Sequence, residues 1–382
     1  MRICHVVPTY LPATRYGGPI HSVHGLCKAL ASLGHGVEVY TTSVDGRGDS
    51  KVPHGEAVDL DGVGVHYFRS RLGRRLYYSP PLGHALASAI DDFDVVHLHS
   101  VFLWPTSRAA RLARAATVPY VVSPRGMLVR ELIEAQSRLV KTGWLELIES
   151  TTLAQAAGVH FTSAQELADA RALPLPLPRP FVVPNGVERP IPAPHPAADE
   201  RHVLYLGRLS WKKNLEALVE AIAGTDLRLT LCGPDDEELA PRLRELASIH
   251  GVGDRLTVRA PVTGLDKWEA LARATLVVLP SINENFGNVV PEAMAVGRPV
   301  VVSTGVGARG IVERAGCGLV CEGTPAALRE AMLALWSDPR RCERLGAAGA
   351  DHVAAHLTWE RVAGSMADRY RRVIAGADRH AR

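Results

Sequence analysis

The sequence has little of several features that would point to whole classes of protein. No run of about 18 apolar residues occurs, so no segment is predicted to cross a membrane. The six cysteines form no CxxC pair and no Cys/His cluster with zinc spacing, which indicates reduced thiols rather than a zinc module. Lysine and arginine number 43 against 40 aspartates and glutamates, an excess too small to predict a nucleic-acid partner. The chain enters a β-pattern at Ile3 without a leader-like segment, so we expect a cytoplasmic protein.

The composition instead describes a globular chain with room for two cores. Of its 382 residues, 47% are apolar and 22% are charged, which is typical of a folded protein rather than a disordered one. A single hydrophobic core rarely extends over that length, and two domains of roughly 180 residues are the natural division.

Short β-branched runs alternate with longer amphipathic runs along nearly the whole chain. The segment 21–33, for example, places Val23, Leu26 and Leu30 at helical spacing. Such strand–helix alternation with nearly continuous apolar strands predicts an α/β fold with parallel sheets covered on both faces. The predicted strands are 3–7, 37–42, 63–68, 94–98, 120–123, 159–162, 181–183, 202–206, 227–231, 255–259, 275–279 and 299–302.

A proline-rich segment divides this pattern in two. Nine of the 26 prolines lie between Pro174 and Pro196. Proline lacks a backbone donor and fixes φ, so the segment is predicted to be a stiff connection, with one short strand inside it. Two sequential doubly wound domains, followed by about 55 helical residues that end in 359–374, are therefore expected.

Ligands of open parallel sheets bind beyond the carboxyl ends of the strands, and this rule selects the candidate residues. In the first half, the loop with Gly17 and Gly18, then His99, then Arg125 follow three predicted strands. His97 and His99 were expected to differ along their strand, with His97 in the core. In the second half, strand ends are followed by Arg208 with Lys213, and by the segment 284–288.

The second-half residues suit a sugar diphosphate joined to a nucleoside. Arg208 and Lys213 offer two cations for a pyrophosphate. Gly287 lets the backbone approach a phosphate, at the start of a helix predicted from about Asn288. Glu292, one turn along, has a carboxylate for the ribose hydroxyls, and Glu284 has one for the sugar. Taken alone, a lone arginine after a strand is usually a surface charge, and a lone glutamate in a first helical turn is usually a dipole contact.

Four arginines also cluster in one predicted loop, and two interpretations of them stay open. They are Arg69, Arg71, Arg74 and Arg75. The cluster is either an ordinary solvated surface or a contact for an anionic acceptor or a lipid headgroup, which would bring peripheral contact with the inner face of a membrane.

These motifs together resemble retaining glycosyltransferases of family 4, which have the GT-B fold. The resemblance is carried by Glu284 and Glu292 within ENFGNVVPEAMAVGRPVV, by GRLSWKKN and by VVPNGV, and it extends over essentially the whole chain. The pieces GGP, DVVHLHS, SPRGML and HFTSAQE resemble one bacterial branch of that family. The resemblance implies two Rossmann-like domains facing across a cleft, 1–184 on the acceptor side and 185–361 on the donor side, with a helix in 362–382 that returns to the first domain.

The resemblance also implies roles for individual positions. Arg208 and Lys213 should contact the donor diphosphate, Glu292 the ribose and Glu284 the transferred sugar. The Gly17–Gly18 loop should line the diphosphate and acceptor side. Backbone N–H groups of the segment Asn285, Phe286, Gly287, Asn288 and Val289 should face donor oxygens.

Arg125 departs from the family pattern. Many relatives have a histidine near the reacting sugar at this position, which puts any histidine role there in doubt. Arginine is not a general base at neutral pH, so Arg125 is expected to stabilise the departing phosphate or an anionic acceptor. Arg208, Lys213, Glu284, Arg125 and His99 are the candidate catalytic residues.

The expected reaction moves a hexosyl-type unit from a UDP- or GDP-sugar to a hydroxyl of a saccharide, lipid-linked or small-molecule acceptor. No metal or other cofactor is expected, because the acidic segments 91–94 and 235–236 precede a strand or start a helix rather than follow strand ends. Alternatives are a same-fold sugar-nucleotide epimerase or phosphorylase and a non-catalytic sugar-nucleotide-binding protein. A dehydrogenase is disfavoured, since no predicted strand is followed by GxGxxG.

Overall fold

The computed structural model describes residues 1–13, 17–129, 149–188 and 201–378, and it divides into two compact units. The first unit consists of Met1–Gly186 together with Trp359–Arg382, and the second of Val187–Thr358. These boundaries lie a few residues from the expected 184 and 362. Part of the proline-rich connection, 189–200, lies outside the described residues.

The first unit is built on an eight-stranded sheet in the order β10-β9-β8-β7-β1-β2-β6-β5. All neighbours in this order are parallel except β5, which pairs antiparallel with β6 at the edge. The strands are β1 (Arg2–Thr9), β2 (Gly36–Thr42), β5 (Ala57–Leu60), β6 (Val63–Phe68), β7 (Val95–His99), β8 (Tyr120–Ser123), β9 (Gly158–Phe161) and β10 (Pro180–Val182). A separate small hairpin is made by β3 (Val44–Asp45) and β4 (Gly48–Asp49).

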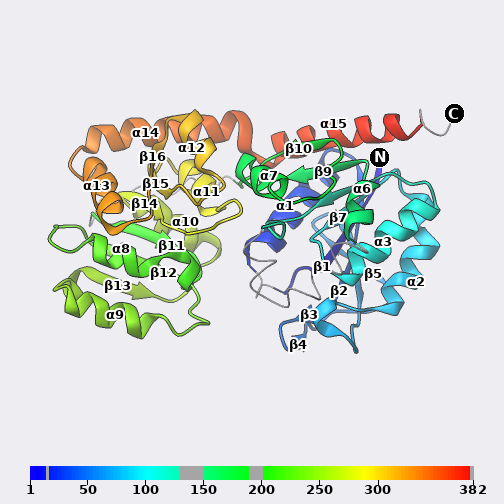
Figure 1. Ribbon diagram of the computed structural model, residues 1–382, viewed down its shortest axis with the longest axis horizontal. Helices are drawn as coiled ribbons and strands as arrows, with labels where there is room; N and C mark the ends of the chain where they lie inside the picture. The colour runs from blue at the N-terminus through cyan, green and yellow to red at the C-terminus, as the bar shows by residue number, and fades with distance from the viewer. Residues whose placement is uncertain (14–16, 130–148, 189–200, 379–382) are drawn as a thin grey trace. The chain divides into compact units, whose positions relative to one another are not determined.

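Helices cover both faces of this sheet because alternate strand residues point to opposite sides. On one face, Ile3 and Val7 of β1 belong to a core with Met366 of α15 (Trp359–Asp378), which packs beside α1 (Gly18–Ser32). On the other face, Cys4 and Val6 belong to a core with α2 (Pro80–Ala89) and α3 (Trp104–Ala115), which lie side by side (Figure 1). The helices α6 (Ser150–Ala154) and α7 (Ala164–Arg171) add to that second core, and short 3-10 turns occupy Arg74–Leu76 and Ile90–Asp92.

The second unit has a six-stranded, wholly parallel sheet in the order β13-β12-β11-β14-β15-β16. The strands are β11 (Val203–Leu206), β12 (Leu229–Cys232), β13 (Leu256–Arg259), β14 (Leu276–Leu279), β15 (Val300–Ser303) and β16 (Gly318–Cys321). The helices are α8 (Leu215–Ala221), α9 (Ala240–Ile249), α10 (Gly264–Arg273), α11 (Val289–Ala295), α12 (Arg309–Ala315), α13 (Pro325–Trp336) and α14 (Pro339–His352). Short turns lie at Trp211–Lys213 and Gly253–Arg255, and a π-helical turn at Val353–Leu357.

The predicted parallel α/β architecture is confirmed, with three local corrections. The edge strand β5 was missed, although Asp61 and Gly62, both at positive φ, form the two-residue turn that joins it to β6. The strand β16 was also missed, because its sequence Gly-Leu-Val-Cys is too short to show a period. The helix expected from Lys213 begins instead at Leu215. Within the described residues, no helix is both long and apolar enough to span a bilayer.

Candidate functional site

The second unit brings its candidate residues together at the carboxyl ends of two adjacent strands. Arg208 follows β11 by one residue, and Lys213 ends the short turn after it. Glu284 lies in the loop that follows β14, the neighbour of β11 in the sheet. The Lys213 ammonium and the Glu284 carboxylate form an ion pair, and each side chain is 21% exposed. Residues 71 positions apart in the sequence are therefore joined at one edge of the sheet.

The backbone around Glu284 is fixed by the loop that follows β15. Glu284 N–H donates to Gly305 O at 3.0 Å, and Glu284 O accepts from Gly307 N–H at 2.8 Å. Gly287 cannot be replaced without strain, because its φ is +89° and a Cβ atom there would lie 2.7 Å from Leu279 Cδ2. The loop is held by backbone contacts, so the Glu284 side chain projects from a rigid base.

Arg208 stands on a loop that is equally constrained. Its carbonyl accepts from the hydroxyl of buried Tyr205 at 2.8 Å, and its Nε lies 4.0 Å from Asp236 Oδ2. The preceding residue, Gly207, meets Gly233 so closely that a Cβ on Gly233 would lie 1.9 Å from the Gly207 carbonyl oxygen. The Arg208 side chain is 39% exposed, so its guanidinium remains accessible to a ligand.

Glu292 lies in the first turn of α11, as expected, and it pairs with Lys267, which no sequence motif singled out. Its Oε1 accepts from Lys267 Nζ at 3.1 Å, and the glutamate side chain is 19% exposed. Burial raises the pKa of the Glu292 carboxyl, and the neighbouring Lys267 ammonium opposes that rise. Lys267 lies on α10 among other charged residues, so only packing of α10 against α11 reveals it.

In the rest of the segment 284–289, the side chains of Phe286 and Val289 are buried, so these two residues can contact a ligand only through their backbone. Phe286 is 3% exposed and Val289 is 7% exposed, and both belong to the core of the second unit. Asn288 immediately precedes α11, and the Phe286 carbonyl accepts from Ala308 N–H at 2.8 Å. Asn285 lies in the same loop, two residues before Gly287.

In the first unit, Gly17 and Gly18 lead into α1. Gly17 precedes the helix with φ 70°, and the Gly18 carbonyl accepts from Ser22 Oγ at 2.9 Å. The preceding residues 14–16 lie outside the described part of the chain. The glycines therefore mark the turn from β1 into α1, at the carboxyl end of the central strand.

The expected difference between His97 and His99 is wrong. Residues i and i+2 of a strand point to the same face, so both side chains enter the core between the sheet and the helices α1 and α15. Their ring centroids are 4.1 Å apart, and both residues are fully buried. His5 and His160, which the sequence did not single out, complete a buried cluster of four histidines with them.

In one branch of this cluster, a backbone carbonyl determines which groups donate and which accept the hydrogen bonds. His160 Nε2 lies 2.9 Å from the Val183 carbonyl, which only accepts, so Nε2 has the proton. His160 Nδ1 therefore accepts from Ser123 Oγ at 2.6 Å, and Ser123 accepts from His97 Nε2 at 2.6 Å. His97 Nδ1 is then left to accept from the Tyr370 hydroxyl of α15 at 2.6 Å.

The other branch starts from Arg125, whose guanidinium only donates. Arg125 Nε and Nη2 lie 3.3 and 3.2 Å from His99 Nδ1, so that nitrogen accepts. His99 Nε2 then donates to His5 Nδ1 at 2.9 Å, which leaves the proton of His5 on Nε2. Arg125 Nη1 also donates to Asn185 Oδ1 of the VVPNGV motif at 3.1 Å.

All four histidines are therefore neutral. Burial, and after it the charge of Arg125, lowers the pKa of His5 and of His160 to about 3. The pKa values of His97 and His99 fall well below 6.5, again first through burial. Ring nitrogens of His5, His97 and His99 lie within 4.8 Å of one another, a spacing that a metal ion could use. A metal ion there would lie beside the buried guanidinium of Arg125, whose positive charge opposes such binding.

A buried glutamate that sequence reasoning missed holds the Arg125 loop. Glu166 is 4% exposed, its Oε1 accepts from Gly126 N–H at 2.7 Å, and its Oε2 accepts from Thr162 N–H and Oγ1 at 2.7 and 2.8 Å. The sequence signal was Ser163-x-x-Glu166, a capping box in which Ser163 Oγ accepts from Glu166 N–H at 3.0 Å. Arg125 itself has φ 56°, which the loop must enforce.

Replacing Glu166 with glutamine is expected to lower the free energy of unfolding by about 2–3 kcal/mol, because hydrogen bonds to a buried charged group contribute that much and an amide NH2 cannot accept. Urea unfolding measures the change. The matched control is Glu343→Gln on α14, an exposed carboxylate. Equal stability of both variants would show that Glu166 is dispensable to the loop.

Comparison with known proteins agrees with this geometry. Residues 17–186 match the model described as Glycosyl transferase 4-like domain, and residues 188–352 match Glycosyl transferases group 1. The chain is 31% identical over 315 residues to a D-inositol 3-phosphate glycosyltransferase 1 of Catenulispora acidiphila. The aligned region covers 75% of this chain and 73% of that protein.

Solved structures show the same fold. Sucrose-phosphate synthase from Thermosynechococcus elongatus superposes with a TM-score of 0.75 at 23% identity, covering 98% of this chain and 99% of the other. Anabaena HepE in complex with UDP-glucose superposes with a TM-score of 0.71 at 17% identity, covering 97% and 99%. The chain therefore belongs to the GT-B glycosyltransferases of family 4 and is a glycosyltransferase.

Proposed function

We propose that the enzyme transfers a hexosyl-type unit from a UDP- or GDP-sugar to an acceptor hydroxyl with retention at the anomeric carbon. The ion pair between Lys213 and Glu284 at the carboxyl ends of β11 and β14 is the main support. In this proposal Lys213 is the cation that binds the diphosphate, and Glu284 beside it is the carboxylate that binds the sugar. In this proposal the second unit binds the donor and the first unit binds the acceptor.

Donor binding follows from the chemistry of these side chains. A lysine ammonium has three donors, so Lys213 can keep its bond to Glu284 and still reach a phosphate oxygen. Arg208, partly exposed, supplies the second cation, and backbone N–H groups of 286–289 complete the cradle. Glu292 binds the ribose hydroxyls, with Lys267 holding its carboxylate in place. The loops 232–234 and 261–262 are the proposed contacts of the nucleobase.

Electrostatic stabilisation of the leaving diphosphate is the proposed source of rate enhancement. Negative charge develops on that group as the glycosidic bond breaks, and preorganised cations lower the barrier because they need no reorganisation. The leaving phosphate then accepts the proton of the acceptor hydroxyl on the same face of the sugar, which gives retention. We propose that this chemistry needs no metal or other cofactor, and undiminished transfer in EDTA would support that.

Arg125 has a supporting role in this proposal. Its bonds to His99 and Asn185 leave one N–H on each of Nη1 and Nη2 uncommitted within the described residues. Those groups suit an anionic oxygen of the leaving diphosphate or of the acceptor. His99, which accepts from Arg125 in the buried cluster, positions the guanidinium rather than reacting.

A donor screen tests the proposal directly. UDP- or GDP-sugars are expected to raise the unfolding temperature of the chain, because a ligand at 100 times its Kd stabilises the folded state by about 2.7 kcal/mol. ADP-sugars and NAD are the comparison ligands. The stabilisation should be lost in Glu292→Ala, and product analysis by NMR should show a retained anomeric configuration. Stabilisation by NAD alone, or an inverted product, would contradict the proposal.

A further inference from the structure

A cavity of about 330 Å³ lies in the first unit, away from the residues described so far. Two loops line it. The segment after the β3–β4 hairpin contributes Lys51 and His54, and the loop after β6 contributes Arg69, Ser70 and Arg71. Asp49 and Arg74 also line the cavity. The strands β2 and β6 are adjacent and parallel, and Ser43 N–H donates to the Phe68 carbonyl just beyond their ends. The cavity therefore lies at the carboxyl edge of the sheet, where ligands of such folds bind.

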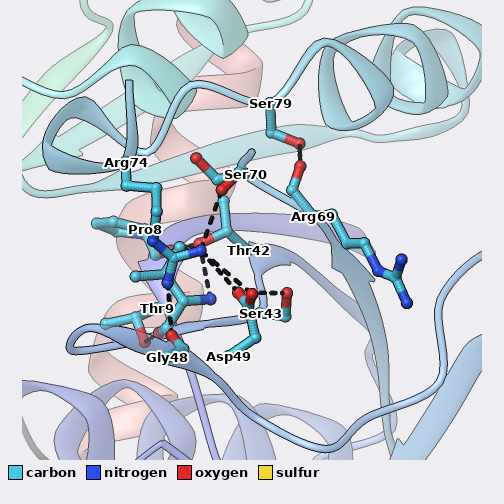
Figure 2. A network of polar contacts seen from close by, with 11 residues as sticks. Pro8, Thr9, Thr42, Ser43, Gly48, Asp49, Arg69, Ser70, Arg74 and Ser79 are labelled. Carbon is cyan, nitrogen blue, oxygen red and sulfur yellow. Dashed lines mark hydrogen bonds and ion pairs between the residues drawn. The ribbon is translucent and has the colours of Figure 1, made fainter. Parts of the chain in front are cut away.

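One arginine of this loop cluster is structural. Arg74 Nη1 lies 3.1 and 3.2 Å from the two carboxylate oxygens of Asp49 and 3.1 Å from the Ser70 carbonyl, and Nη2 donates to the Gly48 carbonyl at 2.5 Å (Figure 2). Ser43 Oγ also donates to Asp49 Oδ1 at 3.1 Å. Arg74 thus ties the β3–β4 hairpin to the loop after β6 and neutralises the carboxylate of Asp49.

Three other cations around the cavity are not neutralised. The side chains of Lys51, Arg69 and Arg71 form no hydrogen bond or ion pair with the described residues. Figure 2 shows the Arg69 guanidinium directed away from the Arg74–Asp49 pair, while its carbonyl accepts from Ser79 Oγ at 2.9 Å. Three like charges around one cavity repel one another unless an anion sits between them.

A buried hydroxyl in the same cavity wall points to a ligand as well. Ser70 is 1% exposed, and its Oγ has no hydrogen-bond partner. Leaving a hydroxyl buried without a partner costs about 1–3 kcal/mol, so a native protein usually provides one. His54 adds a further donor, and its pKa is lowered by partial burial and then by Arg69.

We propose that this cavity binds a phosphate group, with Lys51, Arg69 and Arg71 as its cations and Ser70 Oγ as a hydrogen-bond partner. Arginine forks and a hydroxyl suit a tetrahedral oxyanion. In the proposed function the first unit binds the acceptor, and on that basis the phosphate belongs to the acceptor. The acceptor class is then a phosphorylated saccharide or polyol, or a lipid-linked saccharide with its phosphate.

Calorimetric titration of the full chain with inorganic phosphate and with a hexose monophosphate tests the site without any donor. Both ligands are expected to bind with one-to-one stoichiometry. The Arg69→Ala/Arg71→Ala double variant should weaken binding at least tenfold, and Ser70→Ala, which keeps every charge, should weaken it by about three- to tenfold. Because the titration needs no transfer, its result is independent of whether the proposed reaction is right.

Arg75→Ala is the matched control, since Arg75 lies in the same basic cluster but does not line the cavity. It should leave phosphate binding within twofold of the wild type. Vesicles with 30% phosphatidylserine form the second arm. Vesicle binding that phosphate competes away, and that the double variant loses, would assign the phosphate to a lipid headgroup at this site. Absence of phosphate binding, or equal losses in Arg75→Ala and the double variant, would overturn the proposal.

Discussion

Replacing Lys213 with alanine is expected to lower kcat/KM for sugar transfer by about 100-fold or more. The removed ammonium is proposed to face the charge that develops on the leaving diphosphate, and one such preorganised partner contributes roughly 3 kcal/mol to the barrier. Glu284→Ala should cause a loss of the same order, since Glu284 is the proposed partner of the transferred sugar. Steady-state kinetics with a labelled donor measures both variants.

The structure supplies sharp controls for this experiment. Lys212→Ala removes the adjacent cation and should leave kcat/KM within a few-fold of the wild type. The Lys212 Nζ lies 5.6 Å from the centroid of the Trp211 ring and has no ion pair within the described residues. The Lys213→Ala/Glu284→Ala double variant removes both partners of the ion pair, so no unpaired charge remains at that site.

Stability separates a catalytic loss from a folding loss. Both side chains of the Lys213–Glu284 pair are 21% exposed, so the pair should contribute at most about 1 kcal/mol to the free energy of unfolding. A variant that is fully folded yet nearly inactive supports the assignment. Wild-type activity in Lys213→Ala would remove the central support of the proposed function.

Acidification from pH 7.5 to pH 4.5 is expected to destabilise the first unit by at least about 5 kcal/mol, the sum for His5 and His160 alone. His5 and His160 have folded-state pKa values of about 3, against 6.5 for an ordinary histidine. Each group then binds a proton in the unfolded chain but not in the folded one, which costs about 1.4 kcal/mol per pH unit. His97 and His99 act in the same direction.

The sign follows from depressed pKa values on basic groups. The stability that neutral histidines allow is fully present above about pH 6.5 and is lost as the pH falls toward about 3. Since domains are typically stable by only 5–15 kcal/mol, unfolding in mild acid is expected. Urea unfolding of the full chain at a series of pH values measures the slope.

A substitution within the histidine cluster measures the contribution of a single histidine to this pH dependence. His5→Asn keeps an acceptor for His99 Nε2 and cannot titrate, so the loss between pH 7.5 and pH 4.5 should shrink by about 3 kcal/mol. The cavity left by the smaller side chain lowers stability equally at every pH and does not alter this slope. His84→Asn, on the surface, should leave the slope unchanged. An unchanged slope in His5→Asn would mean that the buried histidines do not control acid unfolding.

The two predicted domains and most strands were accessible from the sequence because they depend on local pattern. The second-unit strands at 203–206 and 276–279 are apolar runs between helical segments, so Arg208, Lys213 and Glu284 could be assigned to strand ends in advance. Short elements such as Gly318–Cys321 lack enough residues to show a period, and boundaries shifted by one or two residues for the same reason.

The contacts among buried residues of the first unit could not be predicted from local sequence pattern. His5, His97 and His160 lie on three separate strands, and the pattern gave no sign that their rings meet, because parallel strands are joined through intervening helices. The separation of His97 from His99 was mistaken because the period of a strand places residues i and i+2 on the same face.

By itself, the sequence determined the α/β class, the two-domain division and the strand-end position of Arg208, Lys213 and Glu284, because each depends on short-range spacing. Tertiary structure alone decided the partners. Lys267 was brought to Glu292 and Glu166 to the Arg125 loop by packing of separate elements, and the loop of Ser70 was brought beside Lys51 and His54. Pairing of that kind depends on how helices and loops fold onto a sheet, and no local pattern encodes it.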